Sequence, residues 1–390
     1  MRHHLLGIAA LPLLVVAGWL LLAPAQADAP RLNPAQSQPA QFSPVAWQAP
    51  ANPGYTGAYA ANTRLAGLST IALDGAVGPE HIALGPDGWL YAAVDGGSVL
   101  RMRPDGSGRE IWAQTGGRVL GFEFDRDGRM IAADAMRGLL AIAAEAPHHV
   151  TVLADRMPDG DPIRFPDAVT IAPDGSVYFT DASRRFSPAE HGGPFEASLL
   201  DFLEHEPTGR VLVYRRGSGV EVVADGLSFA NGILVSQDGQ SLFVAESGNY
   251  RVWRIAAAAR GLDLRRGPSA QAKVLLDGLP GFPDNLMRGM SGRIWLGLAK
   301  PRTASADATA GYPFLRKLAL RLPRFLWPVP PAYGHVLAFD EDGKVLADLQ
   351  DPGGAYPDTT GVLETADRLY IQSVHAEGIG WLPKARARLP

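Results

Sequence analysis

Short runs of alternating apolar and polar residues recur along this chain, each introduced by a tight turn. Most turns are built on Asp-Gly, and an acidic or small polar residue follows each apolar run. The copies are PDGWLYAAVDGG (86–97), DRDGRMIAADAMRG (125–138), PDGSVYFTDAS (173–183), QDGQSLFVAESG (237–248), SGRIWLGLA (291–299) and the weaker ADRLYIQSV (366–374). They return at intervals of about 40 to about 75 residues, the range expected for propeller blades that carry insertions.

This periodicity predicts an all-β fold, a six-bladed β-propeller. Alternation over about five residues marks short strands, and Asp-Gly pairs favour the hairpin turns that join them. The predicted blades lie near 78–115, 118–160, 163–225, 228–277, 281–349 and 357–390. A strand around 66–73 is expected to close the last blade.

Two stretches break the β pattern and predict short helical insertions. Residues 185–207 contain the helix-like SLLDFLEHE. Residues 301–331 are basic and amphipathic, with apolar Phe314, Leu315, Leu318, Leu320, Phe325 and Trp327. The second stretch suits a helix packed on the propeller rim, a lid over the channel, or a membrane-facing patch, because basic segments with Trp and Phe suit a lipid headgroup boundary.

The N-terminus predicts export. An apolar run from Leu5 to Ala25 follows Arg2 and is long enough to span a bilayer as a hydrophobic helix. Ala25-Gln26-Ala27 also has the form of a signal-peptidase site. We therefore expect residues 1–27 to be a signal peptide or a membrane anchor, 28–64 a disordered linker, and 65–390 the propeller. Either interpretation places the body in the periplasm or on the extracytoplasmic face of the membrane.

The composition excludes several kinds of functional site. The chain has 390 residues, 46% of them apolar, a net charge of −4 and no cysteine. Disulfides and thiolate sites are excluded, and no basic stripe suggests a nucleic-acid partner. Nucleophile-elbow, Walker, dinucleotide-binding and His-Glu-x-x-His motifs are absent. The sequence does not predict an oligomeric state.

Polar residues recur at the starts of the predicted blades. They are Glu80 in VGPEHIAL, Asp167 in IRFPDAV, Asn231 in SFANGIL, and Asp284 with Asn285 in GFPDNLM. Such positions in a propeller point into the central channel. These side chains would present oxygen ligands, which suit one hard cation such as Ca²⁺. Singly, each would more simply cap a strand or form an Asx-turn; their repetition at equivalent positions favours a metal site.

Three segments carry a family resemblance. PTGRVLVY (207–214), ADGLSFANGILVSQDGQSLFVAESGNYRVWRI (224–255) and LPGFPDNLMRGMSGRIWLGLAKPR (279–302) resemble the strictosidine synthase-like family, which includes the adipocyte plasma membrane-associated protein. That family belongs to the calcium-dependent six-bladed propellers, with gluconolactonase, senescence marker protein and a phosphotriesterase. The similarity covers roughly 70–385.

The resemblance implies a ligand set. Glu80, Asn231 and Asp284 match the metal-ligand positions of the calcium propellers. The third blade departs from the pattern: relatives have Asn-Asp where this chain has Pro166-Asp167. Proline has no side-chain oxygen, so one ligand or substrate contact is lost unless Asp167 or water replaces it.

The resemblance also implies two further site residues, and Asn285, beside Asp284, is a third candidate. Arg164 matches a substrate-contacting position of gluconolactonase-type members, although it also suits an ordinary strand edge. Asn285 is a second substrate-binding candidate. Glu364, in TTGVLETADRLYIQS, matches the acid–base glutamate of the alkaloid-forming enzymes, and we expect it at the channel mouth.

The leading hypothesis is a calcium-dependent hydrolase of a lactone, aryl ester or phosphoester. The cation would hold the carbonyl or phosphoryl oxygen, and Asp284, Glu364 or Asp167 would activate water or attack. One alternative is a non-enzymatic, membrane-tethered propeller that binds a small molecule or an envelope partner, with the cation as a structural plug. The other is amine–aldehyde condensation of the strictosidine synthase type.

Overall fold

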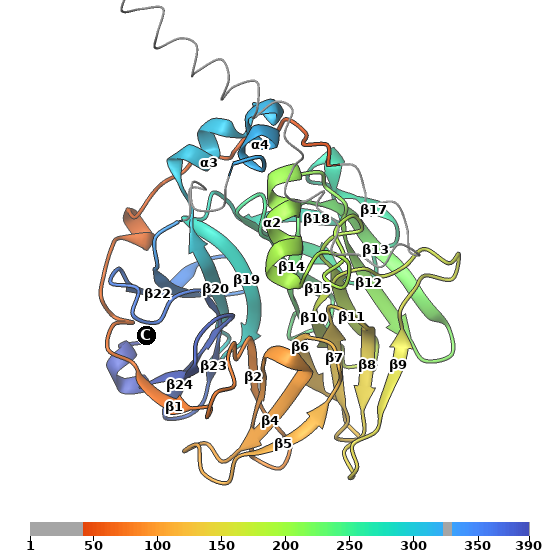
Figure 1. Cartoon of the computed structure of the whole chain (residues 1–390), viewed down its shortest axis with the longest axis vertical. Helices are drawn as coiled ribbons and strands as arrows, with labels where there is room; N and C mark the ends of the chain where they lie inside the picture. The colour runs from red at the N-terminus through yellow and green to blue at the C-terminus, as the bar shows by residue number, and fades with distance from the viewer. Residues whose placement is uncertain (1–41, 323–329, 390) are drawn as a thin grey trace, which may run out of the picture.

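The computed structural model describes residues 42–322 and 330–389, which form six sheets around a central axis (Figure 1). From the inner strand outward, blade 1 contains β2 (His81–Leu84), β3 (Leu90–Ala93), β4 (Ser98–Met102) and β5 (Glu110–Gln114). Blade 2 contains β6 (Val119–Phe124), β7 (Met130–Asp134), β8 (Gly138–Ile142) and β9 (Val150–Ala154). Blade 3 contains β10 (Pro166–Ile171), β11 (Val177–Asp181), β12 (Gly209–Arg215), β13 (Gly219–Leu227) and the short β17 (Leu262–Asp263).

The remaining blades follow the same order. Blade 4 contains β14 (Ala230–Val235), β15 (Ser241–Glu246), β16 (Arg251–Ala256) and β18 (Ala272–Leu276). Blade 5 contains β19 (Gly281–Arg288), β20 (Ile294–Pro301), β21 (Gly334–Phe339) and β22 (Val345–Asp351). Blade 6 contains β23 (Thr359–Glu364), β24 (Arg368–Ser373), β25 (Gly378–Pro383) and β1 (Ser69–Ala72).

The six-bladed propeller predicted from the repeat is confirmed, including its closure. β1 pairs antiparallel with β25, with Ile71 opposite Ile379, so the first strand completes the last blade. The recurrent Asp-Gly turns have the expected conformation. Gly175, for example, has φ +85°, and the carboxylate of Asp174 accepts the N–H of Ser176.

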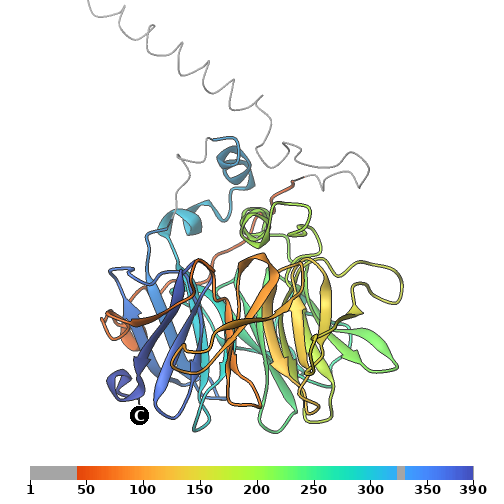
Figure 2. The same cartoon turned by 60° about the horizontal axis from the view of Figure 1, so that its bottom comes forward.

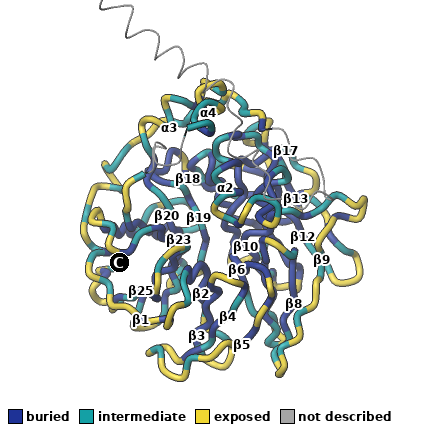
Figure 3. Tube along the Cα trace, in the orientation of Figure 1, coloured by how far each residue is buried: buried dark blue, intermediate teal, exposed yellow. Residues whose placement is uncertain are grey.

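The apolar core lies between neighbouring blades. Phe243 of blade 4 is fully buried in one cluster with Leu296 and Phe339 of blade 5. Burying a side chain of this size contributes about 1.5–3 kcal/mol, and each blade interface repeats such contacts. Figure 3 shows the buried residues concentrated in the strands and the exposed ones in the outer turns.

Both helical insertions lie on one face of the propeller. The start of each inner strand lies beside the end of the second strand, as in the pairs Pro166↔Asp181 and Gly281↔Pro301. We call the face where the inner strands begin the entry face. It carries α2 (Pro194–Glu204) after β11, and α3 (Ala304–Thr309) and α4 (Pro313–Ala319) after β20 (Figure 2). The helical interruptions predicted at 185–207 and 301–331 are confirmed, whereas Phe325 and Trp327 lie outside the described residues.

The predicted disordered linker needs correction over residues 42–64. The Trp47 ring stacks on His205 at 3.8 Å between centroids, and Tyr55 stacks on Tyr333 at 5.0 Å. The N–H groups of Ser43 and Val45 bond to Glu204 at the end of α2. Residues 42–64 therefore form a strap held along the propeller.

The other N-terminal predictions fall outside the described part of the chain. These are the signal or anchor at 1–27, its hydrophobic helix, and linker residues 28–41. Within 42–322 and 330–389, no helix has the length and apolar character needed to cross a bilayer.

Candidate functional site

The polar residues predicted at the channel mouth all stand where inner strands begin. Glu80 immediately precedes β2, Asp167 is in β10, Asn231 is in β14 and Asp284 is in β19. Glu80, Asp167 and Asn231 are buried, and Asp284 keeps part of its surface accessible.

Strand irregularities position these side chains. Five of the six inner strands shift register near their start. In β10 the shift falls between Pro166 and Val169. In β14 it falls between Ala230 and Ile233, and in β19 between Pro283 and Leu286. A bulge bends a strand and re-aims the side chains within it. Asp167, Asn231 and Asp284 each lie inside one of these irregular stretches.

The four side chains are close enough to perturb one another. Burial raises the pKa of Asp284 well above its ordinary value, and the negative charges of Glu80 and Asp167 raise it further. A hydrogen bond from the Asn231 side chain opposes this rise only in part. Burial and the charge of Glu80 likewise raise the pKa of Asp167. The mutual influence of the three carboxyl groups and the hydrogen bond from Asn231 show that the structure brings all four predicted residues together.

Unpaired oxygen atoms mark the same place. Oε2 of Glu80 and Oδ1 of Asn231 are buried and form no hydrogen bond in the structure. Burial raises the pKa of Glu80 to about 7, although the charges of Arg118 and His375 oppose the rise. A buried oxygen without a partner is costly, and a cation would satisfy it.

The carboxylate and amide oxygens of this site are together suitable ligands for a hard cation. No three His, Asp or Glu side chains within 42–322 and 330–389 lie at metal-binding distance from a common point. A cation at this site would therefore need the Asn231 amide oxygen as well as carboxylate oxygens. Oxygen ligands of this kind are those that Ca²⁺ accepts in flexible geometry.

The floor of the site is tied together across the closure of the ring. The carbonyl oxygen of Glu80 accepts hydrogen bonds from Nδ2 of Asn285 at 3.1 Å and from Oγ1 of Thr360 at 2.9 Å. Asn285 also donates to Oε1 of Gln372 at 3.4 Å. Asn285 thus positions the Glu80 backbone; its predicted contact with substrate stays a prediction.

A charged pair beside the site escaped the sequence analysis. Nδ1 of His375, between β24 and β25, lies 2.7 Å from Oδ2 of Asp358, which immediately precedes β23. Nζ of Lys300 lies 2.5 Å from Oδ1 of Asp358. The hydrogen bond to Asp358 raises the pKa of His375, and the charge of Glu80 contributes to the rise. Asp358 precedes its inner strand as Glu80 precedes β2, and this equivalence could have revealed it.

The structure corrects the prediction that Glu364 lies at the channel mouth. Glu364 ends β23, four residues after Thr360, or about 13 Å along an extended strand. Its carboxylate binds Arg293, Lys384 and the indole N–H of Trp295. Burial would raise its pKa, yet these hydrogen bonds lower it to about 2. Glu364 is therefore an ionised structural link between blades 5 and 6, and the condensation hypothesis loses its acid–base residue.

Two predicted features of the third blade have definite positions. Pro166 opens β10 opposite Asp181 and contributes no side-chain oxygen. Nη1 of Arg164 lies 3.4 Å from Oε1 of Glu190, in the insertion between β11 and β12. A role for Arg164 in substrate binding stays a prediction.

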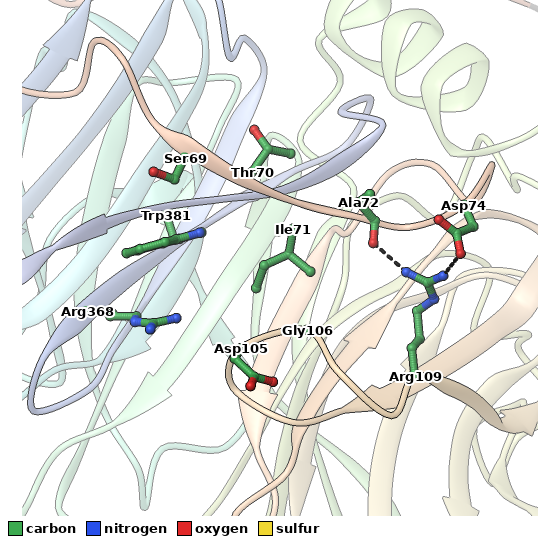
Figure 4. Close-up of a pocket in the computed structure, with 10 residues that line it drawn as sticks. All are labelled: Ser69, Thr70, Ile71, Ala72, Asp74, Asp105, Gly106, Arg109, Arg368 and Trp381. Carbon is green, nitrogen blue, oxygen red and sulfur yellow. Dashed lines mark hydrogen bonds and ion pairs between the residues drawn. The ribbon is translucent and has the colours of Figure 1, made fainter.

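Two cavities are lined by other residues. One of about 760 Å³ occupies the central channel toward the opposite face, lined by His81, Phe122, Val169, Ile233 and Leu286 among others. The other, of about 480 Å³, lies between blades 6 and 1 and is bordered by Asp74, Asp105, Arg109, Arg368 and Trp381 (Figure 4). Its Arg109 guanidinium is already engaged by Asp74 and the carbonyl of Ala72.

Known structures share this architecture. A gluconolactonase from Xanthomonas campestris superposes with a TM-score of 0.57 at 21% identity, covering 90% of this chain and 99% of the other. A calcium-binding regucalcin from Agrobacterium tumefaciens gives 0.54 at 16% identity, covering 81% and 93%. At these identities the likeness establishes the fold alone.

Sequence relatives define the family. Residues 57–102 match the domain described as "Strictosidine synthase-like, N-terminal", and residues 167–259 match "Strictosidine synthase". Strictosidine synthase-like 4 of Arabidopsis thaliana is 32% identical over 76% of this chain and 76% of its own length. The adipocyte plasma membrane-associated protein of Bos taurus is 28% identical over 81% and 77%. The chain is a member of the strictosidine synthase-like family of six-bladed propellers.

Proposed function

We propose that this protein is a calcium-dependent hydrolase of a lactone, an aryl ester or a phosphoester. The observation that carries the proposal is the pair of buried, unpaired oxygens, Oε2 of Glu80 and Oδ1 of Asn231, beside the carboxylates of Asp167 and Asp284. Two structural neighbours, a gluconolactonase and a calcium-binding regucalcin, support a metal-bound site and ester chemistry.

Glu80, Asn231 and Asp284 would hold the calcium ion, and Asp167 would add negative charge beside it. When bound, calcium polarises the substrate carbonyl or phosphoryl oxygen and stabilises the charge that develops there. In turn, the ion would remove the repulsion that raises the pKa values of Asp167 and Asp284. Asp284 suits contact with both ion and substrate because part of its surface is accessible.

His375 is our candidate for proton transfer, in place of Glu364. Its Nδ1 is held by Asp358, so the neutral ring has Nε2 available to accept a proton from an attacking water molecule. Asp358 fixes the ring orientation and stabilises the imidazolium that forms, while Lys300 holds the other carboxylate oxygen. The same imidazolium can return the proton to the departing alcohol oxygen. Asp167 and Asp284 remain alternative groups for activating water.

The test is hydrolysis of an ester panel by the purified protein. Phenyl acetate, a simple lactone and an aryl phosphoester would be assayed with calcium and with excess chelator. We expect calcium-dependent turnover that is lost in Asn231→Ala, with the fold of the variant checked by circular dichroism. Turnover that persists at full rate in chelator would contradict the proposal.

Pro166 supports a second candidate, a non-catalytic binding propeller with a structural cation. Proline at the start of β10 leaves this blade with one side-chain oxygen fewer than an Asn-Asp pair would supply. In that case calcium would raise the melting temperature while no ester in the panel is hydrolysed.

We also propose that residues 1–27 export the chain and place the propeller on the extracytoplasmic side of a membrane. The sequence of the apolar run supports this, as does the similarity to the adipocyte plasma membrane-associated proteins. The mass of the mature protein distinguishes a cleaved signal from a retained anchor.

A further inference from the structure

Helix α4 carries an apolar surface that the propeller does not cover. Tyr312, Phe314 and Leu315 are 62%, 60% and 44% exposed, and Lys317 beside them is exposed as well. Large apolar side chains that gather in the open commonly mark an interaction surface. We call Tyr312, Phe314, Leu315 and Lys317 the α4 tip.

The opposite side of α4 is fixed to the body. The guanidinium of the buried Arg316 donates to the carbonyl oxygens of Leu203 and Glu204 at the end of α2, and to that of Val45 in the strap. Leu320 is fully buried in the cluster that includes Phe186 and Leu200. The α4 tip is therefore held outward by a packed base, above the entry face (Figure 2).

The basic charge at α4 favours a lipid surface as the partner. Lys317 stands exposed beside the apolar side chains, and the sequence contains no acidic residue between Asp307 and Asp340. Exposed aromatic and aliphatic side chains beside basic ones suit the boundary between lipid headgroups and acyl chains. Basic residues near an anionic membrane surface add about 1 kcal/mol each.

The path of the chain also favours a membrane as the partner. The described chain begins at Phe42, and Val45 bonds both to α2 and to Arg316 of α4. The apolar run at Leu5–Ala25 is thus separated from this face by residues 26–41, which reach at most about 55 Å when extended. A bilayer that holds that run lies within reach of the α4 tip.

We propose that the α4 tip docks on an anionic lipid bilayer. Tyr312, Phe314 and Leu315 would insert at the boundary between headgroups and acyl chains, and Lys317 would contact the anionic headgroups. The entry face, with the site of Glu80 and Asp284, then faces the membrane. This orientation favours substrates that partition into lipid over those confined to water. The docking itself does not depend on catalysis.

The absence of cysteine allows a direct test on the full chain. Phe314→Cys, labelled with a polarity-sensitive fluorophore, would be reconstituted in phosphatidylcholine vesicles with and without phosphatidylglycerol. The matched control is Ile111→Cys, because Ile111 is 65% exposed on the outer strand of blade 1. We expect a blue-shifted emission and quenching by lipid-attached quenchers only for the position 314 probe, stronger with phosphatidylglycerol and weakened by Lys317→Glu.

Three outcomes would overturn the proposal. Equal responses of the two probes would show that the tether alone brings the protein near lipid. A probe at position 314 that is already shielded in detergent, without lipid, would mean that a second copy or another segment of this chain covers the α4 tip. A response indifferent to phosphatidylglycerol and to Lys317→Glu would remove the role of charge. Loss of hydrolysis with docking intact would contradict only the proposed function.

Discussion

Nδ1 of His375 lies 2.7 Å from Oδ2 of Asp358, beside the carboxylate of Glu80 whose charge acts on the same histidine. The two residues come from opposite ends of the β23–β24 hairpin, and the pairing of Thr359 with Ser373 brings these ends together. An ionised carboxylate held against imidazole stabilises the protonated ring, so the pKa of His375 lies above its ordinary value.

Replacement of His375 is expected to slow hydrolysis. If neutral His375 accepts the proton from water, His375→Ala should lower kcat by about 10²–10⁴-fold, the usual contribution of a general base. The matched control is His191→Ala, because His191 lies on the same face and contacts Phe186 outside the site. Circular dichroism would check both folds, and equal rates for His375→Ala and wild type would remove His375 from the mechanism.

The pH profile tests the role of Asp358. Activity should increase with pH as His375 loses its proton, and this limb should lie above the ordinary range of histidine because Asp358 raises the pKa. Asp358→Asn removes that stabilisation, so the limb should move to lower pH. A limb that keeps its position in Asp358→Asn but disappears in His375→Ala would mean that Asp358 only supports the loop.

Asp284→Asn is expected to separate metal binding from folding. Burial and neighbouring charges raise the pKa of Asp284, so without a cation its ionisation destabilises the folded state progressively as pH increases above the ordinary carboxyl value. The metal-free variant should therefore be more stable than the metal-free wild type at neutral pH. Wild type alone should gain about 2.7 kcal/mol when calcium reaches a hundredfold excess over its Kd.

Calorimetric melts with calcium and with chelator provide the measurement. Asp342→Asn is the control, because the Asp342 side chain is 91% exposed in a turn of blade 5. An Asp284→Asn protein that gains as much from calcium as wild type would show that the ion binds elsewhere.

Glu364 should be needed for stability and not for catalysis. Glu364→Gln removes a buried carboxylate that holds Arg293 and Lys384, and loss of one partner from such a group costs on the order of 3 kcal/mol. The pKa of Glu364 is depressed to about 2, so its stabilisation is present above the unfolded value, about 4.3, and is lost as pH falls toward 2. Urea melts at pH 7 and pH 3 should therefore differ less for the variant than for wild type, while kcat stays unchanged.

The contrast between Glu364 and Asp358 shows how far the sequence determines the site. Alternation and Asp-Gly turns repeat with every blade, so they predict the strands, the closing strand and the residues that open each blade. A family resemblance identified a carboxylate in the last blade, but only the position along β23 decides its surroundings: Asp358 precedes the strand and Glu364 ends it.

Other features depend on contacts that no local pattern encodes. Residues 42–64 are poor in large aliphatic side chains, yet Trp47 and Tyr55 stack on rings that are distant in the sequence. The register shifts that aim Asp167, Asn231 and Asp284 arise from pairing between strands, so composition alone does not reveal them.

Gly232 is predicted to set the spacing between blades 4 and 5 at the site. A Cβ atom at this position would lie 2.3 Å from the carbonyl oxygen of Asp284 and 2.6 Å from the nitrogen of Leu286, both of which are backbone atoms. Gly232→Ala must therefore push β19 away from β14, at a cost of about 1–3 kcal/mol for overpacking. Because Asp284 moves with β19, its carboxylate is displaced from the site. Calcium affinity should therefore fall even in the protein that remains folded. Gly311→Ala is the control, since a Cβ there meets nothing within 4 Å. Calcium titrations of both variants decide the matter: unchanged affinity in Gly232→Ala would show that the ligands do not depend on this close approach of the inner strands.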